Sequence, residues 1–237
     1  MLSYSLFRHG RRFLLEEFMQ IDETNCSLQP NGARGATQIE HVTDEFILHC
    51  AEEEARGRFY NLLATLLLAP PSDELLHALA VADPIAAQTG DLESAWEQLV
   101  LVAGIMDSGA VREEFDALFV ATGTPLINPH ASLYLSGFMM DRPLAALRDT
   151  LRELRLARQD SAAELEDHLG SLFETMALLI TQGRPLTIQR EIFKTYIGSW
   201  LERCLADIRE TPDANFYRKV VDLIDAFYKV EMQAFTM

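Results

Sequence analysis

The sequence predicts an all-α protein whose residues 44–237 form a single globular domain of roughly eight to ten helices. From residue 44 onward, apolar residues recur at intervals of three and four, and no stretch alternates with a period of two for long. The 237-residue chain is 49% hydrophobic, which is enough to bury a substantial core. No internal repeat of fixed period is present, which argues against a solenoid.

The helices of the first half have recognisable ends. The first expected helix carries apolar residues from Ile47 to Leu67 and ends before the Pro70-Pro71 pair. Ser72 can cap a second helix that runs to about residue 82. A third helix is expected from Asp91, and a fourth carries Val111, Phe115, Leu118 and Phe119, before a connector over residues 122–129.

In the second half, Ser161-x-x-Glu164 has the pattern of a capping box and predicts a helix that begins directly after it. Its expected buried face is Leu165, Leu169, Leu172, Phe173, Met176 and Ile180. Further helices are expected over residues 144–158 and 188–208, and a last one after Pro212.

Residues 1–43 are predicted to be a flexible N-terminal extension, because residues 25–37 are rich in Asn, Gly, Ser and Pro and lack periodicity. Arg11-Arg12-Phe13-Leu14 resembles a twin-arginine export motif, but Glu16 and Glu17 follow where a signal peptide needs apolar residues. The three cysteines are far apart and form no CxxC motif, which fits a reducing compartment. We therefore expect a cytoplasmic protein.

The formal net charge of −16 restricts the kinds of partner. Four arginines and six acidic residues give residues 1–44 a charge of −2, so the helical part carries −14. Such a surface argues against binding to nucleic acid or to an anionic membrane, and it suits a cationic partner. No apolar run approaches the ~18 residues of a membrane span, so no stable membrane insertion is expected.

Most enzyme motifs are missing, since the sequence has no phosphate-binding glycine loop, GxSxG or HExxH motif and no pair of histidines four residues apart. One candidate site contains Glu164, Asp167 and His168. On the expected helix, Glu164 lies one turn before His168 and could hold its imidazole, while Asp167 points away from the apolar face toward solvent. Ordinary boundary residues near a helix N-terminus would give the same pattern.

A second candidate site begins with the apolar residues Phe115, Leu118 and Phe119 and continues through a proline-containing loop to an aromatic segment. Such an arrangement can form a groove for an apolar peptide, or it can be core followed by a connector.

Three segments carry a resemblance to a known family. Phe115-Asp-Ala-Leu-Phe119, followed by Asn-Pro-His-Ala-Ser-Leu-Tyr-Leu over residues 128–135, resembles the "LF…PPYxSVYL" signature of the TorD/DmsD family. Residues 166–170, Glu-Asp-His-Leu-Gly, resemble its "PxDHLG" motif, and residues 216–227 resemble its "FYRxLxxLxxxF" helix. These proteins are chaperones for the maturation of molybdenum-containing oxidoreductases and are related to the NarJ group. The similarity covers about residues 46–235.

The resemblance implies a non-enzymatic, cofactor-free chaperone whose partners are the twin-arginine signal peptide and the apo form of a molybdoenzyme catalytic subunit. Asp167 and neighbouring carboxylates would pair with the leader's arginines, and Phe115, Leu118 and Phe119 would accept its apolar segment. The implied leader-binding residues are Phe115, Leu118, Phe119, Pro129, His130, Ser132, Tyr134, Asp167 and His168.

Two departures from the family pattern carry expectations of their own. His130 stands where relatives have an aromatic residue, which predicts pH-dependent leader binding near neutrality. Leu165 replaces the usual proline, which predicts an earlier helix start. The type of client (dimethyl sulfoxide, trimethylamine N-oxide, nitrate or formate enzyme) and the choice between a monomer and a domain-swapped dimer stay open. The alternatives are a small metal-dependent enzyme that uses His168 with Glu164 or Asp167, and a helical scaffold or nucleotide-responsive regulator.

Overall fold

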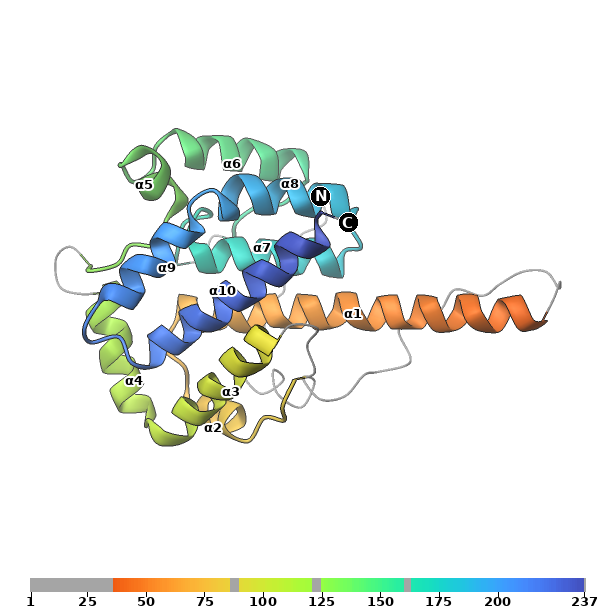
Figure 1. Ribbon diagram of the computed structural model, residues 1–237. Helices are drawn as coiled ribbons and strands as arrows, with labels where there is room; N and C mark the ends of the chain where they lie inside the picture. The colour runs from red at the N-terminus through yellow and green to blue at the C-terminus, as the bar shows by residue number, and fades with distance from the viewer. Residues whose placement is uncertain (1–35, 86–89, 121–124, 160–162, 237) are drawn as a thin grey trace.

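The computed structural model describes residues 36–85, 90–120, 125–159 and 163–236, with side chains described from residue 52 onward. Within these ranges the chain forms ten α-helices, two π-helical segments and no strands (Figure 1). The all-α prediction is confirmed. The helices are α1 (Ala36–Leu68), α2 (Asp73–Ala80), α3 (Gly90–Ile105), α4 (Ser108–Phe115), α5 (Ala131–Ser136), α6 (Arg142–Glu153), α7 (Leu169–Thr181), α8 (Leu186–Ile192), α9 (Leu201–Glu210) and α10 (Phe216–Ala234), and the π-helical segments are η1 (Asp116–Val120) and η2 (Phe193–Gly198).

Several predicted helix ends are confirmed, and their caps explain them. Helix α1 ends at Leu68, just before Pro70-Pro71, and the hydroxyl of Ser72 accepts a hydrogen bond from the amide of Leu75 at 3.3 Å. The start of α1 at Ala36 lies within the predicted extension, whereas residues 1–35, with the twin-arginine look-alike, lie outside the described residues.

Other predicted helix ends are wrong. The expected continuous helix over residues 188–208 is interrupted, because α8 and η2 end at Gly198 and α9 starts again at Leu201. Helix α7 begins at Leu169 and not after the predicted capping box, so replacement of the family proline by Leu165 does not bring the helix start forward. The box residue Ser161 lies outside the described residues. An additional short helix, α5, occupies the segment after His130.

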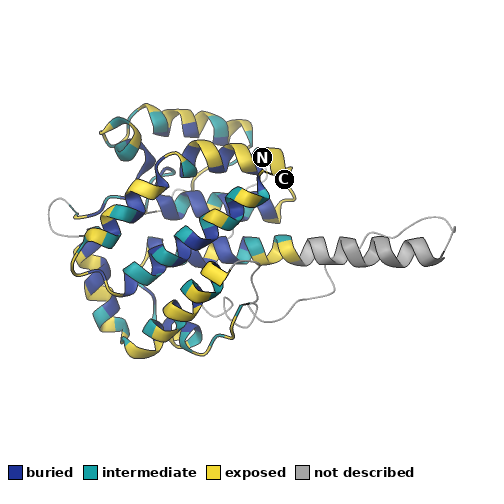
Figure 2. Cartoon of the chain, in the orientation of Figure 1, coloured by how far each residue is buried: buried dark blue, intermediate teal, exposed yellow. Residues whose placement is uncertain are grey.

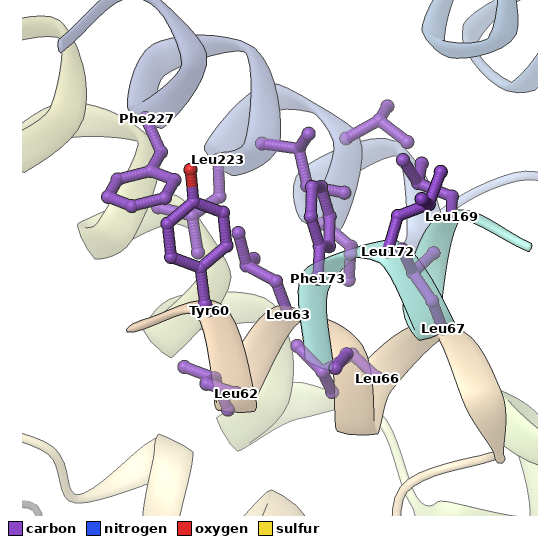
Figure 3. Packing of buried hydrophobic residues seen from close by; sticks show 14 of the residues in the cluster. Tyr60, Leu62, Leu63, Leu66, Leu67, Leu169, Leu172, Phe173, Leu223 and Phe227 are labelled. Atoms are coloured by element: carbon purple, nitrogen blue, oxygen red, sulfur yellow. The ribbon is translucent and has the colours of Figure 1, made fainter. Parts of the chain in front are cut away.

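The core lies where α1 packs against α7 and α10. Figure 3 shows Tyr60, Leu63 and Leu66 of α1 facing Phe173 of α7 and Phe227 of α10, and all five side chains are buried. The rings of Tyr60 and Phe227 meet edge to face at 4.9 Å between centroids. In Figure 2, the buried parts of the helices face the middle of the domain, and the exposed parts lie on its outside. Burial of large aliphatic and aromatic side chains is the main stabilising contribution to such a fold.

Two buried carboxylates attach α10 to the rest of the domain. Glu231 accepts two hydrogen bonds from the Arg56 guanidinium, each at 2.8 Å, and one from the Tyr60 hydroxyl at 2.8 Å. Glu114 of α4 accepts from the backbone amides of residues 215, 216 and 217 at 2.8–3.0 Å, and so caps the N-terminus of α10. Helix α10 is therefore fixed at both ends by charge-assisted hydrogen bonds.

Candidate functional site: a junction of two loops

Two loops that are distant in sequence meet between the N-termini of α5 and α7. The Ala131 amide donates to the Asp167 carbonyl at 2.9 Å, and the Leu169 amide donates to the Pro129 carbonyl at 2.8 Å. These bonds form an isolated antiparallel bridge between His130 and His168. We call the side chains of His130, Ser132, Glu164, Asp167 and His168 the histidine junction. Two of the three motifs behind the resemblance thus meet at one place.

Asp167 is buried, with an exposed fraction of 0%, and its Oδ2 accepts a hydrogen bond from the Ser132 amide at 2.8 Å. Its carboxyl group caps the first turn of α5. The expectation that Asp167 faces solvent is wrong, because it was placed on a helix that in fact begins two residues later, at Leu169. A direct pair with an arginine of a bound leader is therefore not available to Asp167 in this conformation.

His168 is the N-cap of α7, and its Nδ1 accepts a hydrogen bond from the Gly170 amide at 3.1 Å. Burial, together with the neighbouring His130, lowers the pKa of His168 from 6.5 to about 4. The two imidazole rings meet edge to face with centroids 5.0 Å apart. His168 is therefore neutral near pH 7 and serves as a hydrogen-bond acceptor.

Glu164 contacts His130 and not His168, which corrects the expected pairing. Its Oε2 lies 3.5 Å from His130 Nε2, and this hydrogen bond lowers the pKa of Glu164 below its ordinary value. The Glu164 side chain remains 40% exposed, so a carboxylate faces solvent at the edge of the junction. His130 itself is buried, and the predicted pH dependence of leader binding through it stays a prediction.

The junction leaves three buried polar atoms without a hydrogen-bond partner: His130 Nδ1, Ser132 Oγ and Asp167 Oδ1. Most buried polar groups in folded proteins are paired, and each exception calls for an explanation. The described residues contain no group of three His, Cys, Asp or Glu side chains arranged to hold a metal ion.

The apolar half of the predicted site belongs to the core. Phe115 and Leu118 are buried, and Phe115 and Phe119 pack on Tyr217 of α10 with ring centroids 5.7 and 5.1 Å away. Phe119 is partly buried and lies in η1, the π-helical extension of α4. The predicted groove is therefore not open at Phe115 and Leu118, because both side chains are buried, and Tyr217 of α10 packs on Phe115.

Tyr134 links α5 to α9 across the surface beside the junction. Its hydroxyl donates to Asp207 Oδ2 at 2.7 Å, and its ring stacks on Trp200 with centroids 5.2 Å apart. Asp207 is exposed, so a second carboxylate faces solvent near α5. Sequence reasoning missed Asp207 and Trp200, because nothing in the spacing of α9 indicates that it lies against Tyr134.

The fold and the junction define an all-helical protein in which two loop motifs form a partly unsatisfied polar site flanked by exposed carboxylates. The family model "Nitrate reductase delta subunit" matches residues 86–206, about half of the chain. The protein belongs to this family, the NarJ/TorD group, in agreement with the resemblance of its motifs.

One named protein and one solved structure are similar to this chain. The chain is 25% identical over 199 residues to a protein named Chaperone protein TorD from Shewanella pealeana, covering 76% of this chain and 90% of that protein. A solved structure from Archaeoglobus fulgidus, described as a candidate redox enzyme maturation protein, is 19% identical. That match covers 72% of this chain and 93% of the other, with a TM-score of 0.46. No helix in the described part of the chain is long and apolar enough to cross a membrane.

Proposed function

We propose that this protein is a cytoplasmic chaperone for redox-enzyme maturation, which binds the twin-arginine signal peptide of a molybdenum-containing oxidoreductase subunit. It holds that leader while the apo subunit folds and receives its cofactor. Membership in the NarJ/TorD family is the observation that carries the proposal. No covalent step is required of the chaperone, so we expect binding without turnover.

The electrostatics around α5 suit a basic leader. Glu164 and Asp207 are exposed carboxylates near this helix. Glu164 contacts His130, the N-cap of α5, and Asp207 accepts a hydrogen bond from the Tyr134 hydroxyl on α5. Carboxylates held in place lose little conformational entropy when they bind a guanidinium group. Asp167 contributes indirectly, because its contact with the Ser132 amide positions α5.

The test is calorimetry with a synthetic peptide that carries two adjacent arginines followed by an apolar segment. Replacing Glu164 by Gln should weaken binding about threefold to tenfold and flatten its salt dependence, because one charge pair is lost. Glu113→Gln, an exposed carboxylate on α4, is the matched control and should bind as the wild type does. Failure of the wild-type protein to bind the peptide, or equal binding after both arginines become glutamine, would overturn the proposal.

A further inference from the structure

The turn between α5 and α6 exposes large apolar side chains in an unusual way. Phe138 and Met140 are each 70% exposed, and Leu135, at the end of α5, is also exposed. We call these three residues the α5–α6 apolar patch. The other exposed large apolar side chains of the described residues are Val81, Leu101, Ile105, Val120, Leu126 and Leu186, and none of these segments has three of them within six residues. A cluster of exposed large apolar side chains within one short segment is a candidate binding surface.

One residue of this turn, Met140, has a backbone conformation that is uncommon for a non-glycine residue. Gly137 ends α5 with φ 84°, and Met140 has φ 58°, in the left-handed region that non-glycine residues seldom adopt. Ser136 Oγ donates to the carbonyl of Ser132 at 2.7 Å, which holds the last turn of α5 in place. This conformation exposes the apolar side chain of Met140 to solvent, which does not stabilise the fold. We therefore relate it to binding.

We propose that the α5–α6 apolar patch is the contact surface for the apolar segment of the twin-arginine leader. This inference rests on the proposed function and names its apolar subsite. Of the three residues that the resemblance implies for this role, Phe115 and Leu118 are buried, and the partly buried Phe119 packs on Tyr217 of α10. The leader's apolar segment therefore needs a different surface.

Charge complementarity favours the twin-arginine leader as the peptide that binds to the α5–α6 apolar patch. A twin-arginine leader joins a basic segment to an apolar one, and the patch is continuous in sequence with Tyr134, whose hydroxyl holds Asp207. Glu164 lies at the other end of α5, next to His130. Of the cations on α6, Arg148 is engaged by two hydrogen bonds with Glu166. Next to the patch, Asp141 adds a further carboxylate, whose pKa is lowered mainly by a hydrogen bond from the backbone amide of Arg142. An apolar surface flanked by available carboxylates suits a basic–apolar peptide better than a neutral or acidic one.

The experiment uses the full chain and two fluorescent peptides, both with an Arg-Arg pair. One continues with about twelve apolar residues, the approximate length of a leader's apolar region, and the other continues with Gly and Ser. The double variant Phe138→Ser/Met140→Ser should bind the apolar peptide at least about tenfold more weakly than the wild type, because both anchors lose their apolar contact. Its affinity for the Gly/Ser peptide should be unchanged.

The matched control is Val81→Ser/Ile105→Ser, which removes two exposed apolar side chains from the C-terminal ends of α2 and α3. It should bind both peptides as the wild type does. If the wild type binds the apolar peptide and the double variant binds it equally well, the proposed role of the patch is wrong, while the proposed function of the protein is unaffected. If the wild type binds neither peptide, both are overturned. A loss of self-association in sedimentation, with unchanged peptide affinity, would assign the patch to a second copy of the chain and overturn its role as the leader subsite.

Discussion

Buried polar groups occur in two regions of this molecule, and the two regions satisfy them differently. At the ends of α10, Glu114 and Glu231 each accept three hydrogen bonds, and both of their oxygens are engaged. In the histidine junction, by contrast, His130, Ser132 and Asp167 each leave a buried atom without a partner. Satisfied carboxylates stabilise a fold, whereas unsatisfied ones lower its stability and persist where they serve another role. The carboxylates at the ends of α10 are therefore fully hydrogen-bonded, whereas the polar groups of the junction are only partly so.

The largest effect is expected from Arg56→Met at the satisfied region. It leaves the buried Glu231 carboxylate without its cation, and should lower the free energy of unfolding by about 3–5 kcal/mol, measured by denaturant titration. Arg58→Met is the matched control two residues away, because Arg58 pairs with Glu54 on the more exposed face of α1. Its cost should stay below about 1 kcal/mol. Equal losses of unfolding free energy in the two variants would show that the contact between Arg56 and Glu231 contributes no more to stability than the exposed pair of Arg58 and Glu54.

A pH effect is expected from the junction. The pKa of His168 is 6.5 in the unfolded chain and about 4 in the folded one, so the unfolded state takes up the proton first as the pH falls. The free energy of unfolding is therefore at its full value above pH 6.5, and it falls by about 3 kcal/mol as the pH is lowered to 4. Chemical denaturation at several pH values measures it.

His168→Asn should remove this slope and keep the cap of α7, because the Asn oxygen can still accept the Gly170 amide hydrogen bond. The exposed His77→Asn on α2 serves as the control and should retain the wild-type slope. A His168→Asn protein that still shows the full wild-type slope would exclude this histidine as the cause.

The smallest pair of effects compares the two regions directly. Glu114→Gln turns one of two fully used oxygens into a donor that faces backbone amides, and should cost about 2 kcal/mol of unfolding free energy. Asp167→Asn keeps one oxygen for the Ser132 amide and breaks no hydrogen bond, so its cost should be smaller than that of Glu114→Gln, at about 1 kcal/mol. Thermal and denaturant unfolding of both variants decides the point, and a larger cost for Asp167→Asn would reverse the comparison.

Local sequence patterns predicted much of the fold. The helix after Pro212, the end of α1 at two prolines and the Ser72 cap depend on residues that are close in sequence, and all three are confirmed. The start of α7 was misplaced because Leu165 continues the apolar spacing of the helix into a segment that is not helical. Local sequence patterns do not predict the hydrogen bond from the Leu169 amide to the Pro129 carbonyl, because the two residues are distant in sequence.

The candidate site was predicted only in part. The motifs nominated His130, Asp167 and His168, and the structure brings all three to one junction. Their burial and pairing depend on the bridge between the two loops, and the covering of Phe115 depends on Tyr217, about a hundred residues later in the chain. Such long-range contacts leave no periodic trace in the sequence, so exposure could not be judged from spacing alone.

The contacts of α10 also bear on how the chain folds as it is made. Helix α10 is synthesised after the other described helices, and its partners include Arg56 and Glu114, which leave the ribosome much earlier. The Tyr217 hydroxyl of α10 also donates to the Leu66 carbonyl of α1 at 3.0 Å, so this part of α1 is covered only once α10 has formed. Contacts across such sequence distances form late, after their loop-closure cost has been met. The core is therefore covered only after α10 has been synthesised, and a chain cut short before residue 231 would leave Arg56 paired with Glu53 alone.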